Sequence, residues 1–509
     1  MKVAVFCYGF WSYVIVEICQ KNSLLSLVDN SLVTIYSIPA KNVNPADLLA
    51  KLATNQEYAF LFEKGQNEQY AILGFDPLLK VYFDDQFAYI QSRDSNEIEK
   101  RNIINPLDLL EEILSLYQAA FSAVSFDLPF LGGFVGYMGY GACIYFDKIS
   151  QQAKDLYGIP RAYYCFYDTS IVVDYLREQI HIVSLRASEY IEMIVDEINK
   201  YCQQNQNELA AYYVNTLNNK ANFDQRNIFD QVDISFSKKE YEDAFEQCKE
   251  LIKQGEVFQI VLAQRFSLEC TADPLDVYKT LAFTNPSPYQ YYLRFPDFIY
   301  IGSSPETFLC CENGTLSLAA IAGTRPRGND EGQDELFVSQ LKSDEKELAE
   351  HRMLIDLGRN DLGRVCKPGS IKAEETPSIV KYTHVMHLAT QIKGSLSAGS
   401  TVFDAFKSCF PAGTVSGAPK IRAMQLLSEI EPERRGIYSG AIGYFDIRRN
   451  IDSAIAIRSA LIKNDMAHIN AGGGIVFDSQ MEAEYQETCN KAKSVIQAIK
   501  LTHMETMTK

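Results

Sequence analysis

Basic residues are scarce in this chain. Its 509 residues include 48 lysines and arginines against 65 aspartates and glutamates, so the formal net charge at pH 7 is −17. A negative field of this kind repels polyanions over a long range. The composition therefore argues against nucleic acid and against anionic membranes as partners. A small anionic substrate remains compatible with it, because a binding site needs only a few local cations.

Cysteine pairs with the spacing of a metal or redox motif are missing. The chain has 12 cysteines, and no two of them have C-x-x-C spacing. Cysteines so dilute do not make a disulfide scaffold, and the missing motif argues against a zinc ribbon and a thioredoxin-type site. We therefore expect reduced thiols and a cytoplasmic location.

An apolar run of transmembrane length is missing as well. The N-terminal run from Val3 to Val16 follows Lys2, is interrupted by Ser12 and stops at Glu17. It is too short to span a bilayer, and it lacks the small-residue cleavage site of a secretory signal. We predict a strand or the start of a helix here, with a signal peptide as the alternative.

The length of the chain corresponds to two to four domains at about 100–200 residues each. Asparagine and glutamine cluster between residues 203 and 233, which is typical of a linker. We therefore predict two units, residues 1–233 and residues 234–502. Strand-like segments outnumber helical ones and do not alternate regularly with them. This pattern favours an α+β class with large, mostly antiparallel sheets.

Two helices have well-marked starts. Asp344 is followed three residues later by Glu347, and Ser479 by Glu482, which is the spacing of a capping box. After the second start, apolar residues recur every three or four positions and predict a buried stripe. The stripe consists of Tyr485, Cys489, Ala492, Ile496 and Ile499. Acidic residues of these helices lie off the stripe, and each one alone is equally consistent with a solvated face.

Four segments combine glycines, which allow backbone conformations closed to other residues, with hydroxyl, amide or cationic groups. They are Ala322–Gly328, Asp356–Arg364, Pro411–Lys420 and Ala471–Gly474. Groups of this kind suit the binding of carboxylates or phosphates. None of the four is a Walker A sequence or a Rossmann glycine motif, so a nucleotide is not indicated.

His384 and His387 have H-x-x-H spacing, which on a helix is compatible with zinc. Their neighbours favour a strand, where odd spacing points the two rings to opposite faces. One ring then faces a cavity as a general acid while the other is structural. Both interpretations stay open at this level.

In this order, the segments resemble the chorismate-utilising enzymes, and most closely the family of anthranilate synthase component I. The resemblance is dense from Ser237 to Ile499 and includes Gly255–Arg265, Asn285–Tyr289 and Gly302–Glu306. It implies large antiparallel sheets packed as a sandwich with surrounding helices. It also implies a regulatory and partner-docking N-terminal unit before a chorismate-binding catalytic unit.

The resemblance assigns roles to individual residues. Glu350 and Glu487 would hold Mg²⁺, an ion that takes one or two carboxylates and keeps water at other positions. His387 would be the general acid that assists departure of the C4 hydroxyl, and Glu306 an acid or base near C2. Thr324 completes this catalytic set. The carboxylates of chorismate would be received by Arg458, Tyr438, Lys491, Gly323, Thr324 and the amides of Gly472, Gly473 and Gly474.

The implied reaction is the conversion of chorismate and ammonia to anthranilate and pyruvate, the first committed step of tryptophan biosynthesis. No glutaminase motif is visible in the chain. The resemblance therefore implies ammonia from a glutamine amidotransferase subunit, in a heteromeric complex expected to be a heterotetramer. Two alternatives stay open: an aminodeoxyisochorismate synthase that stops before pyruvate leaves, and a non-catalytic regulatory subunit of the same fold.

Two positions bear on the choice of nucleophile. Isochorismate and salicylate synthases have a water-activating lysine where this chain has Gln259, and aminodeoxychorismate synthases have a nucleophilic lysine where it has Ala322. Neither residue can serve as that base or nucleophile. The resemblance therefore implies direct attack by ammonia.

The segment that corresponds to the tryptophan effector site departs from the family pattern. Family members inhibited by tryptophan usually have Leu-Leu-Glu-Ser, and here the serine is replaced by Lys64. Pro288 and Tyr289 match the other side of that site, whereas Gln290 stands where methionine is common. The resemblance thus leaves open whether tryptophan is an inhibitor.

Overall fold

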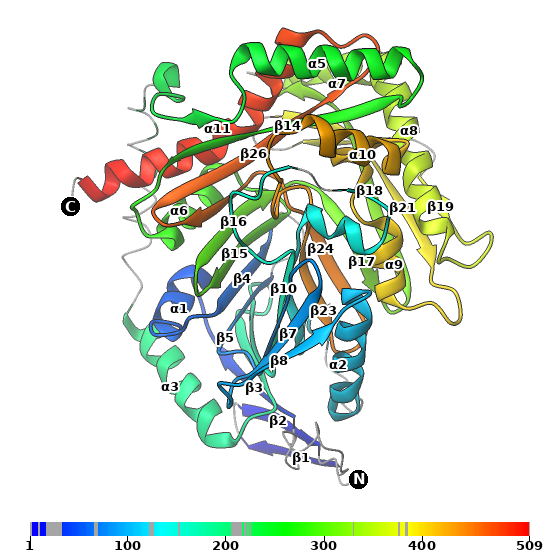
Figure 1. Ribbon diagram of the computed structural model, residues 1–509. Coiled ribbons are helices and arrows are strands. Elements are labelled where there is room, and N and C mark those ends of the chain that lie inside the picture. Colours follow the sequence, from blue (N-terminus) through cyan, green and yellow to red (C-terminus); the bar gives the residue numbers. More distant parts are fainter. Residues whose placement is uncertain are drawn as a thin grey trace.

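Two large antiparallel sheets form the centre of the molecule, and helices cover their outer faces (Figure 1). The computed structural model describes residues 3–8, 11–16, 33–65, 70–121, 127–150, 153–204, 216–217, 220, 223, 225–328, 330–374, 377–381 and 385–507. Strands β1 (Val3–Tyr8) and β2 (Trp11–Val16) make a separate antiparallel pair, which confirms a strand rather than a helix in the N-terminal run.

The first large sheet, called sheet I, has 12 strands. In spatial order they are β19 (Lys372–Ala373), β21 (Val385–Ser395), β18 (Thr315–Pro326), β17 (Thr307–Glu312), β24 (Ile451–Ile455), β23 (Ala441–Asp446), β9 (Gly133–Met138), β10 (Ala162–Tyr167), β6 (Leu79–Phe83), β7 (Phe87–Ser92) and β8 (Ile98–Asn102), with β20 (Ser378–Lys381) beside β21.

The second large sheet, called sheet II, also has 12 strands. In spatial order they are β13 (Asp233–Ile234), β14 (Gln259–Glu269), β26 (Met466–Ile475), β25 (Ser459–Lys463), β16 (Phe298–Ser304), β15 (Tyr289–Phe295), β4 (Ala59–Lys64), β5 (Tyr70–Phe75), β11 (Thr169–Asp174), β12 (Gln179–Ser184) and β3 (Thr34–Pro39), with β22 (Gly417–Ala418) beside β14.

Both sheets combine strands from the two ends of the sequence. In sheet I, β23 pairs with β9, and in sheet II, β15 pairs with β4. Each pairing joins a strand that precedes residue 233 to one that follows it. The division into residues 1–233 and 234–502 therefore stays a prediction about sequence segments. Most of the Asn- and Gln-rich stretch lies outside the described residues.

Aromatic side chains fill the space between the sheets. The ring of Phe295 on β15 lies 4.6 Å from that of Tyr163 on β10 and 5.7 Å from that of Tyr137 on β9, measured between centroids. Phe60 and Tyr291 belong to the same buried cluster. Rings that interdigitate from two facing sheets define a sandwich. The predicted α+β class with packed antiparallel sheets is confirmed.

Helices complete the outer layers. Apolar residues of sheet I pack against α2 (Pro106–Phe121), α8 (Glu345–Gly363) and α9 (Val402–Cys409). Those of sheet II pack against α1 (Pro45–Leu52), α3 (Ser188–Gln204), α6 (Pro274–Thr284) and α11 (Met481–Met507). Helices α5 (Lys238–Lys253), α7 (Glu331–Ser343) and α10 (Lys420–Ile430) lie at the upper end in Figure 1. Among the described helices, none has the length and apolar composition needed to cross a membrane.

One of the two predicted helix starts forms as expected. Asp344 is the N-cap of α8, and its carboxylate accepts hydrogen bonds from the amides of Lys346 and Glu347. The second start is displaced, because α11 begins at Met481 and Ser479 Oγ accepts a hydrogen bond from the Val476 amide instead. The predicted stripe of α11 faces the core: four of its members are buried, and the fifth, Tyr485, is half-buried and packs against the same cluster.

Candidate active site

Two helices each present a pair of glutamates three residues apart. Helix α8 lies on sheet I and contributes Glu347 and Glu350, and α11 lies on sheet II and contributes Glu484 and Glu487. Burial raises the pKa of Glu350, and the negative charges of Glu347 and Glu487 raise it further. Burial likewise raises the pKa of Glu484, and Glu487 adds to the effect. The four carboxylates therefore form one acidic cluster between the helices.

The close fit of α8 to sheet I depends on Gly358. A Cβ atom at this position would lie 2.7 Å from Ile392 Cδ1 and 2.8 Å from Leu318 Cδ1. Because glycine has no Cβ, the helix approaches the sheet here without displacing the ends of these two side chains. Because Glu350 is on the same helix, this contact helps to fix the height of its carboxylate above the sheet.

Glu350 is joined to sheet II by a hydrogen bond. Nε2 of the buried Gln259, at the start of β14, donates to Glu350 Oε1 over 2.9 Å. The bond joins residues from opposite layers of the sandwich. It thereby connects the helix that covers sheet I to β14, a strand of sheet II.

The three predicted glycines lie on β26, opposite residues 261–263 of β14. The ladder between β25 and β26 covers Met466 to His468 and stops before the glycines. A Cβ atom at Gly473 would lie 3.1 Å from Glu484 Oε2, and one at Gly472 would lie 3.2 Å from the hydroxyl of Tyr438. The glycines therefore bring the backbone of β26 close to the acidic cluster and to a predicted substrate-binding residue.

Cations lie beside the carboxylates. Lys491 Nζ lies 2.6 Å from Glu487 Oε1 and donates a hydrogen bond of 2.8 Å to the carbonyl oxygen of Gly472. Arg458 has a positive φ of 53°, which is a strained conformation for a side chain of this size. Its neighbours include Glu306 and Glu487, whose charges oppose the lowering of its pKa by burial.

Glu306 and Thr414 both line a pocket of about 420 Å³. Burial raises the pKa of Glu306 from 4.5 to about 7, although the charges of Lys491 and Arg458 act in the opposite direction. A carboxyl group with this pKa can release or accept a proton near neutral pH. This property suits the acid or base role that the sequence predicts.

His387 is held by the backbone of the neighbouring strand. Its Nδ1 lies 2.9 Å from the carbonyl oxygen of Gly323, which can only accept, so Nδ1 carries the proton. Burial is the main reason that the pKa of His387 is lowered to about 4; the charges of Arg458 and Lys491 act in the same direction, and the hydrogen bond with Gly323 acts against them. The ring is therefore neutral at pH 7 in the absence of a substrate.

Gly323 forms a bulge in β18. The register against β21 shifts between Ala322 and Thr324, and Gly323 has a φ of 65°. The bulge turns its carbonyl towards His387. The backbone of Thr324 lies opposite His387. The side chain of Thr324 and the whole of His384 lie outside the described residues.

The contacts above bring the remaining predicted residues together in one place. These residues are Glu306, Glu350, His387, Tyr438, Arg458, Gly472, Gly473, Gly474, Glu487 and Lys491. Glu347 and Glu484 were not predicted as members of the site. The signal for them is the repeated spacing of three residues between the two glutamates of each helix, because residues at i and i+3 share one helix face.

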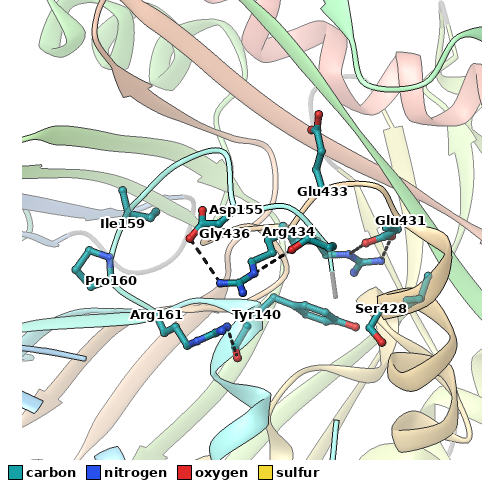
Figure 2. Close-up of a pocket in the computed structure, with 14 residues that line it drawn as sticks. Tyr140, Asp155, Ile159, Pro160, Arg161, Ser428, Glu431, Glu433, Arg434 and Gly436 are labelled. Carbon is teal, nitrogen blue, oxygen red and sulfur yellow. Dashed lines mark hydrogen bonds and ion pairs between the residues drawn. The ribbon is translucent and has the colours of Figure 1, made fainter. Parts of the chain in front are cut away.

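A separate pocket of about 620 Å³ lies beneath α10 and is shown in Figure 2. Tyr140, Asp155, Arg161 and Arg434 line it, and none of the predicted site residues does. The buried Arg435 in its wall donates to both carboxylate oxygens of Glu431, at 2.8 and 2.6 Å, and to the carbonyl oxygen of Val261 on β14. This ion pair anchors the strand that carries Gln259.

The predicted effector residues lie around a further pocket of about 440 Å³, which Lys64, Tyr289 and Gln290 line. Pro288 adjoins it and accepts a hydrogen bond from the Gly65 amide. Lys64 Nζ lies 2.6 Å from Asp452 Oδ2, and the hydroxyl of Tyr289 donates to Asp452 Oδ1 over 2.9 Å. A lysine ammonium therefore already neutralises Asp452, one of the two acidic residues that line this pocket; the other is Glu63.

Comparison with known proteins assigns the chain to a class. A family model described as chorismate binding enzyme matches residues 41–497. The chain is 38% identical over 437 residues to anthranilate synthase component 1 of Acetivibrio thermocellus, which covers 85% of this chain and 87% of that protein. It is 35% identical to the protein of the same name from Lactococcus lactis, covering 91% and 98%.

Solved structures agree with this result. Anthranilate synthase component I from Streptococcus pneumoniae matches with a TM-score of 0.71 at 34% identity, covering 90% of this chain and 99% of that one. The menaquinone-specific isochorismate synthase of Escherichia coli shares the fold, with a TM-score of 0.66 at 16% identity and coverages of 94% and 97%. The chain therefore belongs to the family of chorismate-binding enzymes. The three relatives named above at 34–38% identity are component 1 of anthranilate synthase, which is a lyase, so the resemblance drawn from the sequence is confirmed.

Proposed function

We propose that the chain converts chorismate and ammonia to anthranilate, pyruvate and water. The nitrogen bonds to C2 while the C4–oxygen bond breaks, and the enolpyruvyl group then leaves as pyruvate with aromatisation of the ring. The observation that carries the proposal is the meeting of the acidic cluster with Arg458, Lys491, His387 and Glu306 in one site. The site has Arg458 and Lys491 for a dianionic substrate, the carboxylates of the acidic cluster for a metal cation, and His387 and Glu306 for proton transfer.

Glu350 and Glu487 are the proposed ligands of Mg²⁺. The donor set fits this ion: it is carboxylate oxygen from two helices, and the nearby Glu484 has a buried Oε2 with no hydrogen-bond partner among the described residues. In the described part of the chain no three ligating side chains are close enough to surround an ion. Water and substrate would therefore supply the other ligands. When bound, the ion would offset the negative charge of a substrate carboxylate.

Arg458, Lys491 and the backbone of Gly472 to Gly474 are the proposed receptors of the two chorismate carboxylates. A guanidinium can bind a carboxylate through two parallel hydrogen bonds. Lys491 would exchange its present partner, Glu487, for the substrate. Because the whole chain carries a net charge of −17, these local groups must outweigh an unfavourable long-range field.

The same cations bear on how His387 can become an acid. Burial is the largest cause of its pKa of about 4 in the free site, and the charges of Arg458 and Lys491 contribute to the lowering. When the carboxylates of chorismate neutralise them, the pKa of His387 rises, and a protonated ring can assist the departure of the C4 hydroxyl. Glu306, with a pKa of about 7, would transfer the proton at the C2 side.

Ammonia is proposed to come from a glutaminase partner. The names of the relatives, component 1, imply a second subunit, and we propose a heterotetramer with a glutamine amidotransferase. A cytoplasmic location fits the ten described cysteines, which are all thiols. For tryptophan we propose weak or no inhibition, since Lys64 is paired with Asp452, an acidic residue of the effector pocket.

The proposal is tested by incubating the purified chain with chorismate, MgCl₂ and ammonium chloride. We expect anthranilate fluorescence and an equal amount of pyruvate in a coupled dehydrogenase assay. Glu350→Gln should lose Mg²⁺-dependent turnover by about 100-fold or more while keeping its fold. The matched control, Glu345→Gln, changes an exposed glutamate in the first turn of the same helix and should keep wild-type activity.

Other outcomes would contradict the proposal. Accumulation of the amino adduct without pyruvate would identify an aminodeoxyisochorismate synthase. No consumption of chorismate by the folded chain would favour a non-catalytic subunit. Full activity of Glu350→Gln would refute the metal assignment.

A further inference from the structure

The turn between β26 and α11 joins two elements of the active site. β26 contains Gly472 to Gly474, and α11 carries Glu484, Glu487 and Lys491. A Cβ atom at Gly473 would lie 3.1 Å from Glu484 Oε2, so the strand and the first turns of the helix are in close contact. The path of the connecting turn therefore helps to set where the side chains of α11 lie relative to the strand.

Hydrogen bonds within the turn use only part of its backbone. The Ser479 amide donates to the Val476 carbonyl over 3.0 Å, and the Val476 amide donates to Ser479 Oγ over 3.0 Å. These two bonds close a tight turn from Val476 to Ser479. The carbonyls of Phe477 and Ser479 take part in neither bond. Such carbonyls need a donor from water or from another part of the chain.

Lys249 of α5 supplies a donor to this turn. Its Nζ donates to the carbonyl of Ser479 over 3.1 Å, to that of Phe477, and to that of Val476 over 3.4 Å. A lysine ammonium has three N–H donors and no acceptor, so its donors match these carbonyls in number. Nζ also lies 5.6 Å from the centroid of the Phe477 ring, which is within the range of a cation–π contact. One side chain thus contacts the turn at several points.

Helix α5 is itself fixed to the strands of the site. Its buried residues Tyr241 and Phe245 belong to one core cluster with Ile260 of β14 and Ile475 of β26. The helix lies beside the start of α11 (Figure 1). The N-terminal end of a helix favours negative charge, so the dipole of α11 does not account for a cation at this place. The carbonyls of the turn account for it.

We infer that Lys249 is a positioning residue of the active site: by holding the turn from Val476 to Ser479, it keeps the side chains of α11 in place beside β26. This inference rests on the proposed function and deepens it. Glu487 is a proposed metal ligand and Lys491 a proposed receptor of chorismate, and both follow the turn on one helix. Lys249 would act on both through the backbone of the turn. Loss of its ammonium should therefore weaken the binding of metal and substrate more than it slows the chemical step.

The test replaces Lys249 by alanine in the purified full chain and follows the exchange of backbone amide hydrogens. Exchange in residues 476–491 should become about tenfold faster or more, because the turn loses charge-assisted hydrogen bonds, while exchange in the central strand β9 should not change. The matched control is Lys253→Ala, which removes an exposed lysine one turn further along the same helix. It should exchange like the wild type.

Ethylammonium chloride provides a specific rescue of the exchange. Its ammonium group can enter the space left by the lysine side chain and donate to the same carbonyls. It should slow the exchange of residues 476–491 in Lys249→Ala, whereas tetramethylammonium chloride at the same concentration has no N–H donor and should not. Unchanged exchange in this segment of Lys249→Ala, faster exchange spread evenly over the whole chain, or an equal effect of the two salts would overturn the inference.

Turnover links the turn to the chemistry of the site. Lys249→Ala should raise the KM for chorismate and the Mg²⁺ concentration for half-maximal activity by about fivefold or more, and lower kcat by less than about threefold. Lys253→Ala should keep all three constants. An active wild-type chain whose Lys249→Ala variant keeps its KM and its Mg²⁺ dependence would overturn the positioning role. A wild-type chain that forms no anthranilate would overturn the proposed function, while the exchange experiment would still judge the hold of Lys249 on the turn.

Discussion

Replacing Glu306 by glutamine tests the electrostatics of the site most sharply. Burial raises the pKa of Glu306 from 4.5 to about 7. A rise of this size corresponds to about 3 kcal/mol of unfavourable free energy for the ionised form in the folded chain. This cost is absent below pH 4.5, where both states are protonated, grows as the pH rises, and is complete above pH 7. The wild-type chain therefore loses stability between these two values.

Glu306→Gln removes this pH dependence. At pH 8 the variant should be more stable to urea than the wild type by about 3 kcal/mol, and at pH 5 by less than about 1 kcal/mol. Its kcat should nevertheless fall by about 100-fold or more, because the proton-transfer group is gone. Glu312→Gln is the matched control, since it changes an exposed glutamate on the adjacent strand. A stability difference that is the same at pH 5 and pH 8 would refute the reasoning.

Two further substitutions probe the bulge and the effector pocket. Gly323→Ala places a side chain at a φ of 65° and 2.8 Å from Leu341 Cδ1, so we expect a loss of about 1–2 kcal/mol in stability and a fall in kcat of more than tenfold. The control is Gly314→Ala, where φ is 78° and the added Cβ meets open space; it should reduce stability and leave kcat unchanged. Equal losses of kcat in Gly323→Ala and Gly314→Ala would contradict the role of the bulge. Lys64→Ser breaks the 2.6 Å pair with Asp452 and exposes an acidic group that can receive an amino group. Tryptophan should then inhibit the variant at least tenfold more strongly than the wild type, and an unchanged response in an inhibition assay would contradict this view of the pocket.

Local features of the fold could be predicted because short-range patterns determine them. Asp344 caps α8 as its spacing predicts, and the stripe from Cys489 to Ile499 is buried on α11. The start predicted at Ser479 is displaced to Met481, and the Ser479 hydroxyl accepts a hydrogen bond from the Val476 amide in the preceding turn. A capping pattern identifies the helix amides that need an acceptor, but it does not determine which side chain supplies that acceptor.

Long-range contacts could not be predicted from these patterns. Gln259 and Glu350 are 91 residues apart in sequence and meet only because α8 and β14 belong to opposite layers. The pairing of β9 with β23 likewise depends on which strand edges meet, which alternation of apolar residues leaves undetermined. The roles of Glu350 and Glu487 came from the resemblance to a family, and they stay predictions until metal binding is measured.

The most direct test of the central claim follows the nitrogen atom. The purified chain would be incubated with chorismate, MgCl₂ and ¹⁵N-ammonium chloride, and the products analysed by mass spectrometry. We predict anthranilate that carries the ¹⁵N label, together with one equivalent of pyruvate. A labelled amino adduct without pyruvate, or an unlabelled hydroxylated isomer of chorismate, would contradict the account.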